Sequence, residues 1–118
     1  MNFDKYKEMV DKMVVASMLS YMEEDEECGY TADNVKACKV LLDGYLDVLK
    51  TMKAPSDDEI MQQVKNVVLS LNGLNEKADY ALIETDQREV IWEIIQTSAV
   101  DCGLQEYEDD ITEEWREW

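Results

Sequence analysis

The residues of this chain whose types and spacing could do chemistry are almost all carboxylates. Asp and Glu number 28 among 118 residues, and two dense runs are EEDEE at 23–27 and EKAD at 76–79. Asp43 and Asp47 stand four residues apart, about one helical turn, and would share a helix face. All-oxygen ligand sets suit Mg²⁺, which commonly acts on phosphate substrates. The carboxylates therefore predict one candidate chemistry, a magnesium site on facing helices.

The EEDEE and EKAD segments are similar to the glutamate pairs and the ExxD segment of all-α nucleotide pyrophosphohydrolases. The resemblance implies a Mg²⁺-dependent phosphohydrolase, which we keep as an alternative function. Residues 23–27 are nevertheless expected in a loop, and 28 acidic residues produce such spacings by chance, so solvated carboxylates are the favoured interpretation. Neither residues 23–27 nor QEYEDDITEE at 105–114 follows the residue order of a calcium-binding EF-hand loop.

Other catalytic groups are missing or badly placed. The chain has no histidine, the commonest general base and metal ligand, and no GxxxxGK[ST] or GxGxxG phosphate loop. Cys38 and Cys102 fall on apolar stripes, whereas Cys28 stands among acidic residues that blunt thiol reactivity. Three cysteines without a CxxC pair indicate free thiols in a reducing compartment. We therefore expect no catalytic residue, no cofactor and no metal.

The formal net charge of −17 is the second guide to function. Residues 23–33 carry −6 and residues 84–118 carry −10, whereas residues 34–54 carry +2. A field of this sign repels nucleic acid and anionic membranes and attracts basic surfaces. The chain also lacks an apolar run of about 18 residues and a signal-peptide pattern, which favours a bacterial-type cytoplasm. The predicted partner is a basic protein, with no direct nucleic-acid or membrane binding.

Four amphipathic helices are predicted by apolar residues that recur at steps of three and four. They cover about residues 3–22, 32–52, 57–72 and 86–102, and a short C-terminal helical turn follows. Four Gly and one Pro leave little punctuation for an all-β fold, so we expect an all-α bundle with residues 1–118 in a single domain. The expected buried stripe of the first helix contains Phe3, Tyr6, Val10, Met13, Val14, Ser17 and Tyr21, and is widened by Met9, Met18 and Met22.

Capping residues predict where these helices begin. Thr31 or Asp33 would cap the second helix, and Thr85 would cap the fourth. The third helix follows Pro55 and the sequence SDDE at 56–59, which is a capping box with extra negative charge at the positive helix end.

Glycines predict where the helices end. Gly29 breaks the chain after the first helix, and Gly73 and Gly103 are the expected left-handed residues after the third and fourth. Gly44 lies inside the second helix, where it fits either a close helix crossing or no role at all. Residues 75–85 fit either an extended or a helical conformation.

The chain's last nine residues, DITEEWREW, place two tryptophans among glutamates. Thr112 would cap a turn that carries Trp115 and Trp118 on one face, close enough to reach Trp92 at the edge of the bundle. Such a short helix is unstable alone in water, so the turn must dock, on its own bundle in the favoured case or on a second chain in the other. We expect the segment to be ordered, with both indoles substantially buried.

The predicted function is a small acidic cytoplasmic interaction protein. Immunity proteins that block basic nuclease toxins and DNA-mimic inhibitors are of this general kind, and a structural homo-oligomer, such as a homodimer, is a further alternative. An aromatic anchor within an acidic rim is typical of a binding surface. The candidate partner-binding residues are Glu106, Glu108, Asp109, Asp110, Glu113, Glu114, Trp115 and Trp118.

Overall fold

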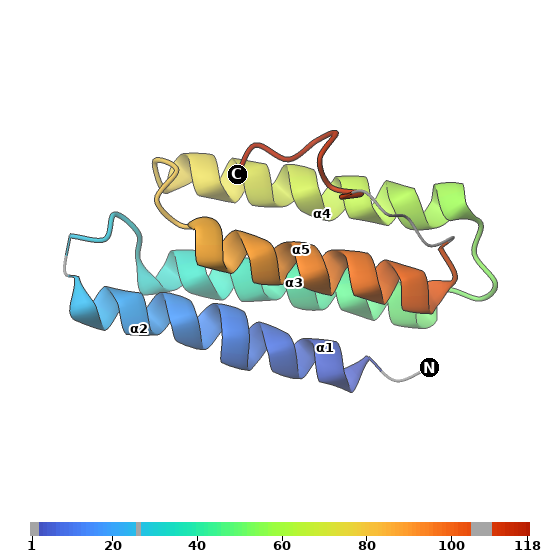
Figure 1. Ribbon diagram of the computed structural model, residues 1–118, viewed down its shortest axis with the longest axis horizontal. Helices are drawn as coiled ribbons and strands as arrows, with labels where there is room; N and C mark the ends of the chain where they lie inside the picture. Colours follow the sequence, from blue (N-terminus) through green and yellow to red (C-terminus); the bar gives the residue numbers. More distant parts are fainter. Residues whose placement is uncertain (1–2, 26, 105–109) are drawn as a thin grey trace.

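Four helical rods lie side by side in the computed structural model of the chain, which describes residues 3–25, 27–104 and 110–118 (Figure 1). The first rod consists of three consecutive segments, α1 (Asp4–Met9), η1 (Val10–Val15) and α2 (Ala16–Glu24). The other three are α3 (Ala32–Thr51), α4 (Asp57–Lys77) and α5 (Thr85–Cys102). The described residues contain no strand, and the predicted all-α bundle is confirmed. Within the same residues, no helix has the length and apolar character needed to cross a membrane.

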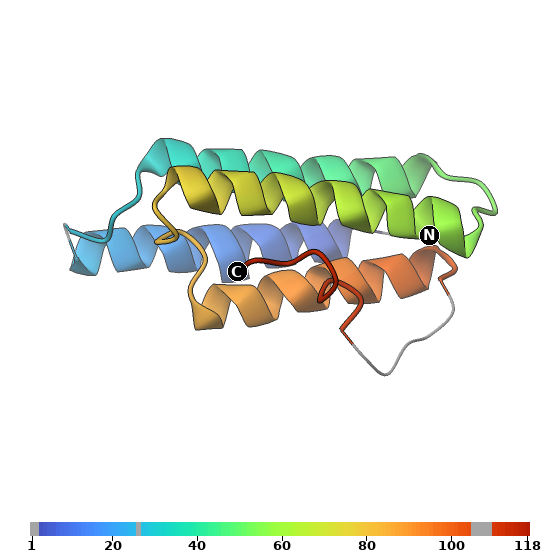
Figure 2. The same ribbon diagram turned by 90° about the horizontal axis from the view of Figure 1, so that it is seen from above.

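The centre of the bundle is formed by α3 and α5, which contact each other and both contact the first rod and α4. In Figure 1, α4 lies along one side of this central pair and the first rod along the other. Figure 2 shows α3 and α4 side by side, with the C-terminal segment crossing between α4 and α5. The core between the rods is aliphatic, and its fully buried side chains include Leu42, Leu46, Leu71, Ile91, Ile94 and Ile95.

A π-helical segment, η1, sets the phase of the first rod. The core positions of this rod follow one another in steps of four: Tyr6, Val10, Val14 and Met18. A step of four exceeds an α-helical turn by about 40°, so a regular α-helix would carry these side chains progressively away from the core. The wider turns of η1 compensate for this drift. The predicted stripe was therefore wrong for Met13 and Tyr21, which are exposed, whereas Met18 is fully buried.

Two of the predicted helix starts are confirmed. Capping boxes at Thr31 and Ser56 begin α3 and α4, because each hydroxyl accepts a backbone N–H three residues later, from Asn34 (3.3 Å) and Glu59 (3.2 Å). The predicted cap at Thr85 was wrong. Glu84 takes the extended cap position, its side chain makes no capping hydrogen bond, and Thr85 is already helical.

Gly103 has the positive φ predicted for it, and Gly29, predicted only as a break after the first helix, also has a positive φ. Gly103 follows α5 with φ +123°, and the Leu104 N–H donates to the Ala99 carbonyl at 3.0 Å, which closes the helix end. Gly29 lies after the first rod with φ +92°, and a Cβ there would stand 2.8 Å from the Cβ of Ala81. Gly29 therefore allows both the turn and the close approach of two loops.

The predicted end of the third helix at Gly73 was wrong, because α4 continues to Lys77. The helix ends through Asp79 and Tyr80, which both have positive φ despite their side chains. The Tyr80 N–H donates to the Asn75 carbonyl (2.7 Å), and the buried Asn75 side chain accepts from the Ile83 N–H (3.0 Å). Asn75 therefore fixes this helix end, and residues 75–85 form a last helical turn, an irregular loop and the start of α5.

Candidate interaction surface

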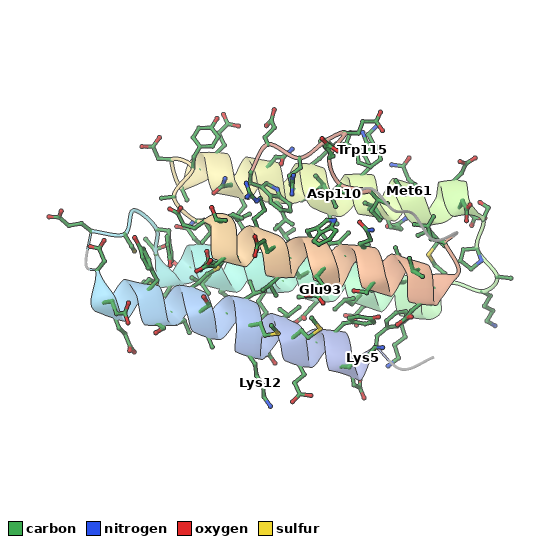
Figure 3. The ribbon with its side chains drawn as sticks, in the orientation of Figure 1. Lys5, Lys12, Met61, Glu93, Asp110 and Trp115 are labelled. Atoms are coloured by element: carbon green, nitrogen blue, oxygen red, sulfur yellow. The ribbon has the colours of Figure 1, made fainter. Side chains whose placement is uncertain are left out.

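The C-terminal segment, residues 110–118, docks on its own chain, between α4 and α5. The Asn72 amide of α4 donates to the Trp115 carbonyl (2.7 Å) and accepts from the Glu117 N–H (3.0 Å). Gln96 of α5 accepts from the Ile111 N–H at 3.2 Å. Figure 3 shows Trp115 and Asp110 on this side of the bundle, away from Lys5 and Lys12 on the first rod. Both terminal indoles are half-buried against the core, so the expected ordered tail is observed in its favoured arrangement.

The turn inside this segment begins at Asp110 and not at Thr112, which corrects the predicted cap. One Asp110 carboxylate oxygen accepts from the Thr112 N–H (2.8 Å) and hydroxyl (2.5 Å), and the other lies 3.0 Å from the Arg116 guanidinium. Thr112 is fully buried, and its hydroxyl donates to Asp110 and does not cap a helical turn. The turn covers residues 111–115, and Trp118 lies beyond it. The two indoles therefore do not share one helical face as predicted.

Ion pairing divides the acidic residues into two groups. On the first rod and α3, lysines pair with four acids, and the pairs are Lys7–Asp47, Lys12–Glu8, Lys39–Asp11 and Lys39–Asp43. On α5, Asp86, Glu89 and Glu93 follow at helical spacing along one exposed face. No Lys or Arg within the described ranges lies within 4.0 Å of these three carboxylates. The exposed face of α5 therefore carries a row of three carboxylates that have no Lys or Arg partner among the described residues.

Asp101 shares the exposed face of α5 but belongs to the paired group. The Tyr6 hydroxyl donates to its carboxylate, and the Lys5 ammonium lies 3.3 Å away. The Tyr6 hydrogen bond and the Lys5 charge hold the pKa of Asp101 below its usual value. These contacts fasten the start of the first rod to the end of α5, so Asp101 has a structural role.

A small hollow lies where the C-terminal segment meets α5. Its volume is about 320 Å³, and it is lined by Arg88, Glu89, Trp92, Asp110 and Arg116. Trp92 is half-buried, and its indole N–H donates to Gln96 at 2.8 Å. Asp110 and Arg116 of the C-terminal segment therefore lie beside Trp92, whereas the predicted approach of Trp115 and Trp118 to Trp92 stays a prediction. The hollow places an aromatic side chain and both arginines of the chain beside the acidic face.

The predicted site residues have different surroundings. Glu113 and Glu114 are exposed, Asp110 is in an ion pair with Arg116, and Glu106, Glu108 and Asp109 lie outside the described residues. The prediction did not single out the α5 carboxylates, although their spacing of three and four residues was visible in the sequence. It also missed Asn72 and Gln96, because polar residues beside an apolar stripe carry no signal of what they bind.

The carboxylates proposed for magnesium are not gathered in the structure. Among the residues that the structure describes, no group of three or more Asp, Glu, Cys or His side chains could hold a metal ion. Asp43 and Asp47 are paired with lysines, Glu76 lies in the last turn of α4, and Asp79 lies in the left-handed end that follows it. The described residues therefore do not bring the predicted magnesium ligands together.

No family model, curated protein or solved structure matches this chain. The class of protein is therefore defined by its own fold and surface. It is an all-α bundle of four helical rods, with lysine–carboxylate pairs on the first rod and α3 and a row of three carboxylates on α5 that have no described Lys or Arg partner.

Proposed function

We propose that this chain is a cytoplasmic interaction module that binds a basic protein through the exposed face of α5. The observation that carries the proposal is the row of three exposed carboxylates on α5, Asp86, Glu89 and Glu93, which have no Lys or Arg partner among the described residues. Four acids of the first rod and α3, by contrast, have lysine partners. These three carboxylates span about 10 Å along the helix. A surface of this kind gains most in association rate and specificity from a positively charged one.

Trp92 supplies the apolar part of the proposed contact. It lies between Glu89 and Glu93 in the sequence, lines the hollow beside the C-terminal segment and remains partly exposed. A lysine or arginine of the partner can stack on the indole while its charge pairs with a neighbouring carboxylate. Tryptophan at the centre of a charged rim is a common hot spot of protein interfaces. Partners of this chemistry include nuclease toxins and other enzymes with a basic nucleic-acid-binding surface.

The test compares two variants of equal net charge. The first carries Asp86→Asn, Glu89→Gln and Glu93→Gln, and the control carries Asp58→Asn, Glu76→Gln and Asp79→Asn at exposed positions on or just after α4. Each protein is immobilised and exposed to an extract of the source cells, and bound proteins are eluted in salt steps and identified by mass spectrometry. We expect the wild type and the control to retain the same lysine- and arginine-rich protein and to release it as the salt concentration rises. The α5 variant should not retain this protein.

Two outcomes would contradict the proposal. One is equal retention of that protein by the α5 variant and the control. The other is retention that salt leaves unchanged, because a contact dominated by exposed carboxylates must weaken under screening. Circular dichroism of all three proteins shows whether each variant keeps its helices.

A further inference from the structure

A second surface lies on the other side of α4 from the C-terminal segment. Two adjoining hollows of about 320 and 580 Å³ form one groove between α3 and α4, because both are lined by Val40, Leu41 and Ser70. Val40 and Val48 in this groove are 61% and 40% exposed. The C-terminal segment covers the junction of α4 with α5, whereas no segment among the described residues covers the junction with α3 (Figure 2).

Two glycines line this groove in the interior of the helices, Gly44 on α3 and Gly73 on α4. Both are exposed, and a Cβ at either position would have no neighbouring heavy atom within 4 Å. Glycine inside a helix costs about 1 kcal/mol relative to alanine. The close helix crossing considered for Gly44 is not formed within the described chain, so neither glycine is required by its own fold. Both leave room for another backbone to approach the groove closely.

The charges that face the groove are few and opposite at its two ends. Asp33, Lys36 and Lys77 line one end and sum to +1. Glu59 lies one turn before the lining residue Gln63 on the same face of α4 and gives −1 at the other end. None of these four charged side chains forms an ion pair with another described residue. The face is therefore neutral in sum, in a chain of net charge −17.

We propose that two copies of this chain associate through the α3–α4 groove, with a two-fold axis that reverses the helix direction. In this arrangement the positive end of each groove meets the negative end of the other, and the exposed valines are buried at the centre. Neutrality matters because two chains of charge −17 repel each other through their acidic surfaces. A surface two helices wide and about 30 Å long offers on the order of 500 Å² per copy, close to the smallest area of a stable interface.

Ionic strength separates this contact from the one proposed for α5. Net repulsion between two like-charged chains opposes the dimer, so added salt should strengthen self-association. Binding of a basic partner should weaken over the same range. The two proposals concern different faces, and either can fail without the other.

Sedimentation equilibrium of the full chain tests the dimer over a concentration series at low and high salt. We expect wild type to pass from the 13.7 kDa chain to twice that mass, at lower concentrations when salt is high. Val40→Glu places a charge at the centre of the groove and should raise the dissociation constant by more than about tenfold. Met13→Glu makes the same change at a position that is 45% exposed on the first rod, and should dimerise like wild type.

A wild-type protein that stays monomeric throughout the series would overturn the dimer, and the groove would then belong to a different partner. A dimer that Val40→Glu leaves intact would overturn the assignment to this groove. Circular dichroism distinguishes a loss of dimer from a loss of fold. Gly44→Leu gives a further check, since its side chain meets open space in the monomer and should block the approach of a second copy.

Discussion

Asn72 holds the C-terminal segment with one side-chain amide. Asn72→Ala would leave the Trp115 carbonyl and the Glu117 N–H without this partner, and each such hydrogen bond contributes about 1 kcal/mol. We expect urea unfolding to show a loss of about 2 kcal/mol, and tryptophan emission to shift to the red as the segment loosens. The control Asn66→Ala removes an exposed amide that bonds only Gln62 and should change little. Unchanged emission in Asn72→Ala would contradict the anchoring role.

Cys38 makes the stability of the fold depend on alkaline pH. Burial raises the pKa of its thiol from 9.0 to about 12, so the thiolate forms in the unfolded chain well before it forms in the native protein. The contribution of Cys38 to stability is complete below about pH 9 and is lost as pH rises towards 12. Urea unfolding across this window should show a decline that is smaller in Cys38→Ala. An equal decline in both proteins would assign the effect to buried tyrosines such as Tyr30, whose pKa burial also raises to about 12.

At the scale of the helices, Gly73 and Gly103 stand in similar sequences but have opposite effects on stability. Gly103 in CGL ends α5 with φ +123°, a conformation that strains any other residue, so Gly103→Ala should destabilise the fold by about 1–2 kcal/mol. Gly73 in NGL lies inside α4, where Gly73→Ala should stabilise the monomer by about 1 kcal/mol. Urea unfolding at low protein concentration measures both. Changes of the same sign would contradict the assigned helix ends.

Gly73 and Gly103 also show which parts of this fold could be predicted from sequence patterns and which could not. The helices, the capping boxes at Thr31 and Ser56 and the end at Gly103 depend on residues within a turn of one another, and these local signals predicted them. The continuation of α4 past Gly73 depends on Asn75, whose side chain reaches Ile83 only after the loop has folded back. The anchors of the C-terminal segment likewise join residues more than ten positions apart, which local spacing does not reveal.

The π-helical segment was missed for a different reason. Steps of three and of four were both counted as helical, so the uninterrupted steps of four in the first rod drew no attention. A regular helix differs from one with a widened turn only in the total rotation of the core positions about the helix axis, because each step of four adds about 40° of drift.

On the candidate surface, the charge of the sequence alone located the acidic region. Which carboxylates are paired could be determined only from the positions of the lysines in the structure.

The whole molecule carries enough like charge for ionic strength to change its stability. Repulsion within a compact chain of net charge −17 exceeds that in the expanded unfolded chain. Raising NaCl from about 0.01 M to about 0.5 M shortens the screening length several-fold, and we expect the melting temperature to rise by about 4 °C or more. The α5 variant, with three acids neutralised, should gain less. A melting temperature that falls with salt would show that the ion pairs of the first rod outweigh the repulsion.

The uneven distribution of lysines and acids along the chain also gives the molecule an electric dipole moment. Seven of the nine lysines lie between residues 5 and 53, whereas residues 84–118 carry a net charge of −10. The electric field of a positively charged partner exerts a torque on such a protein before the two make contact. The torque acts over distances up to about one Debye length. Rotation would bring α5 to the front, so a larger fraction of collisions would begin in an orientation that can proceed to binding.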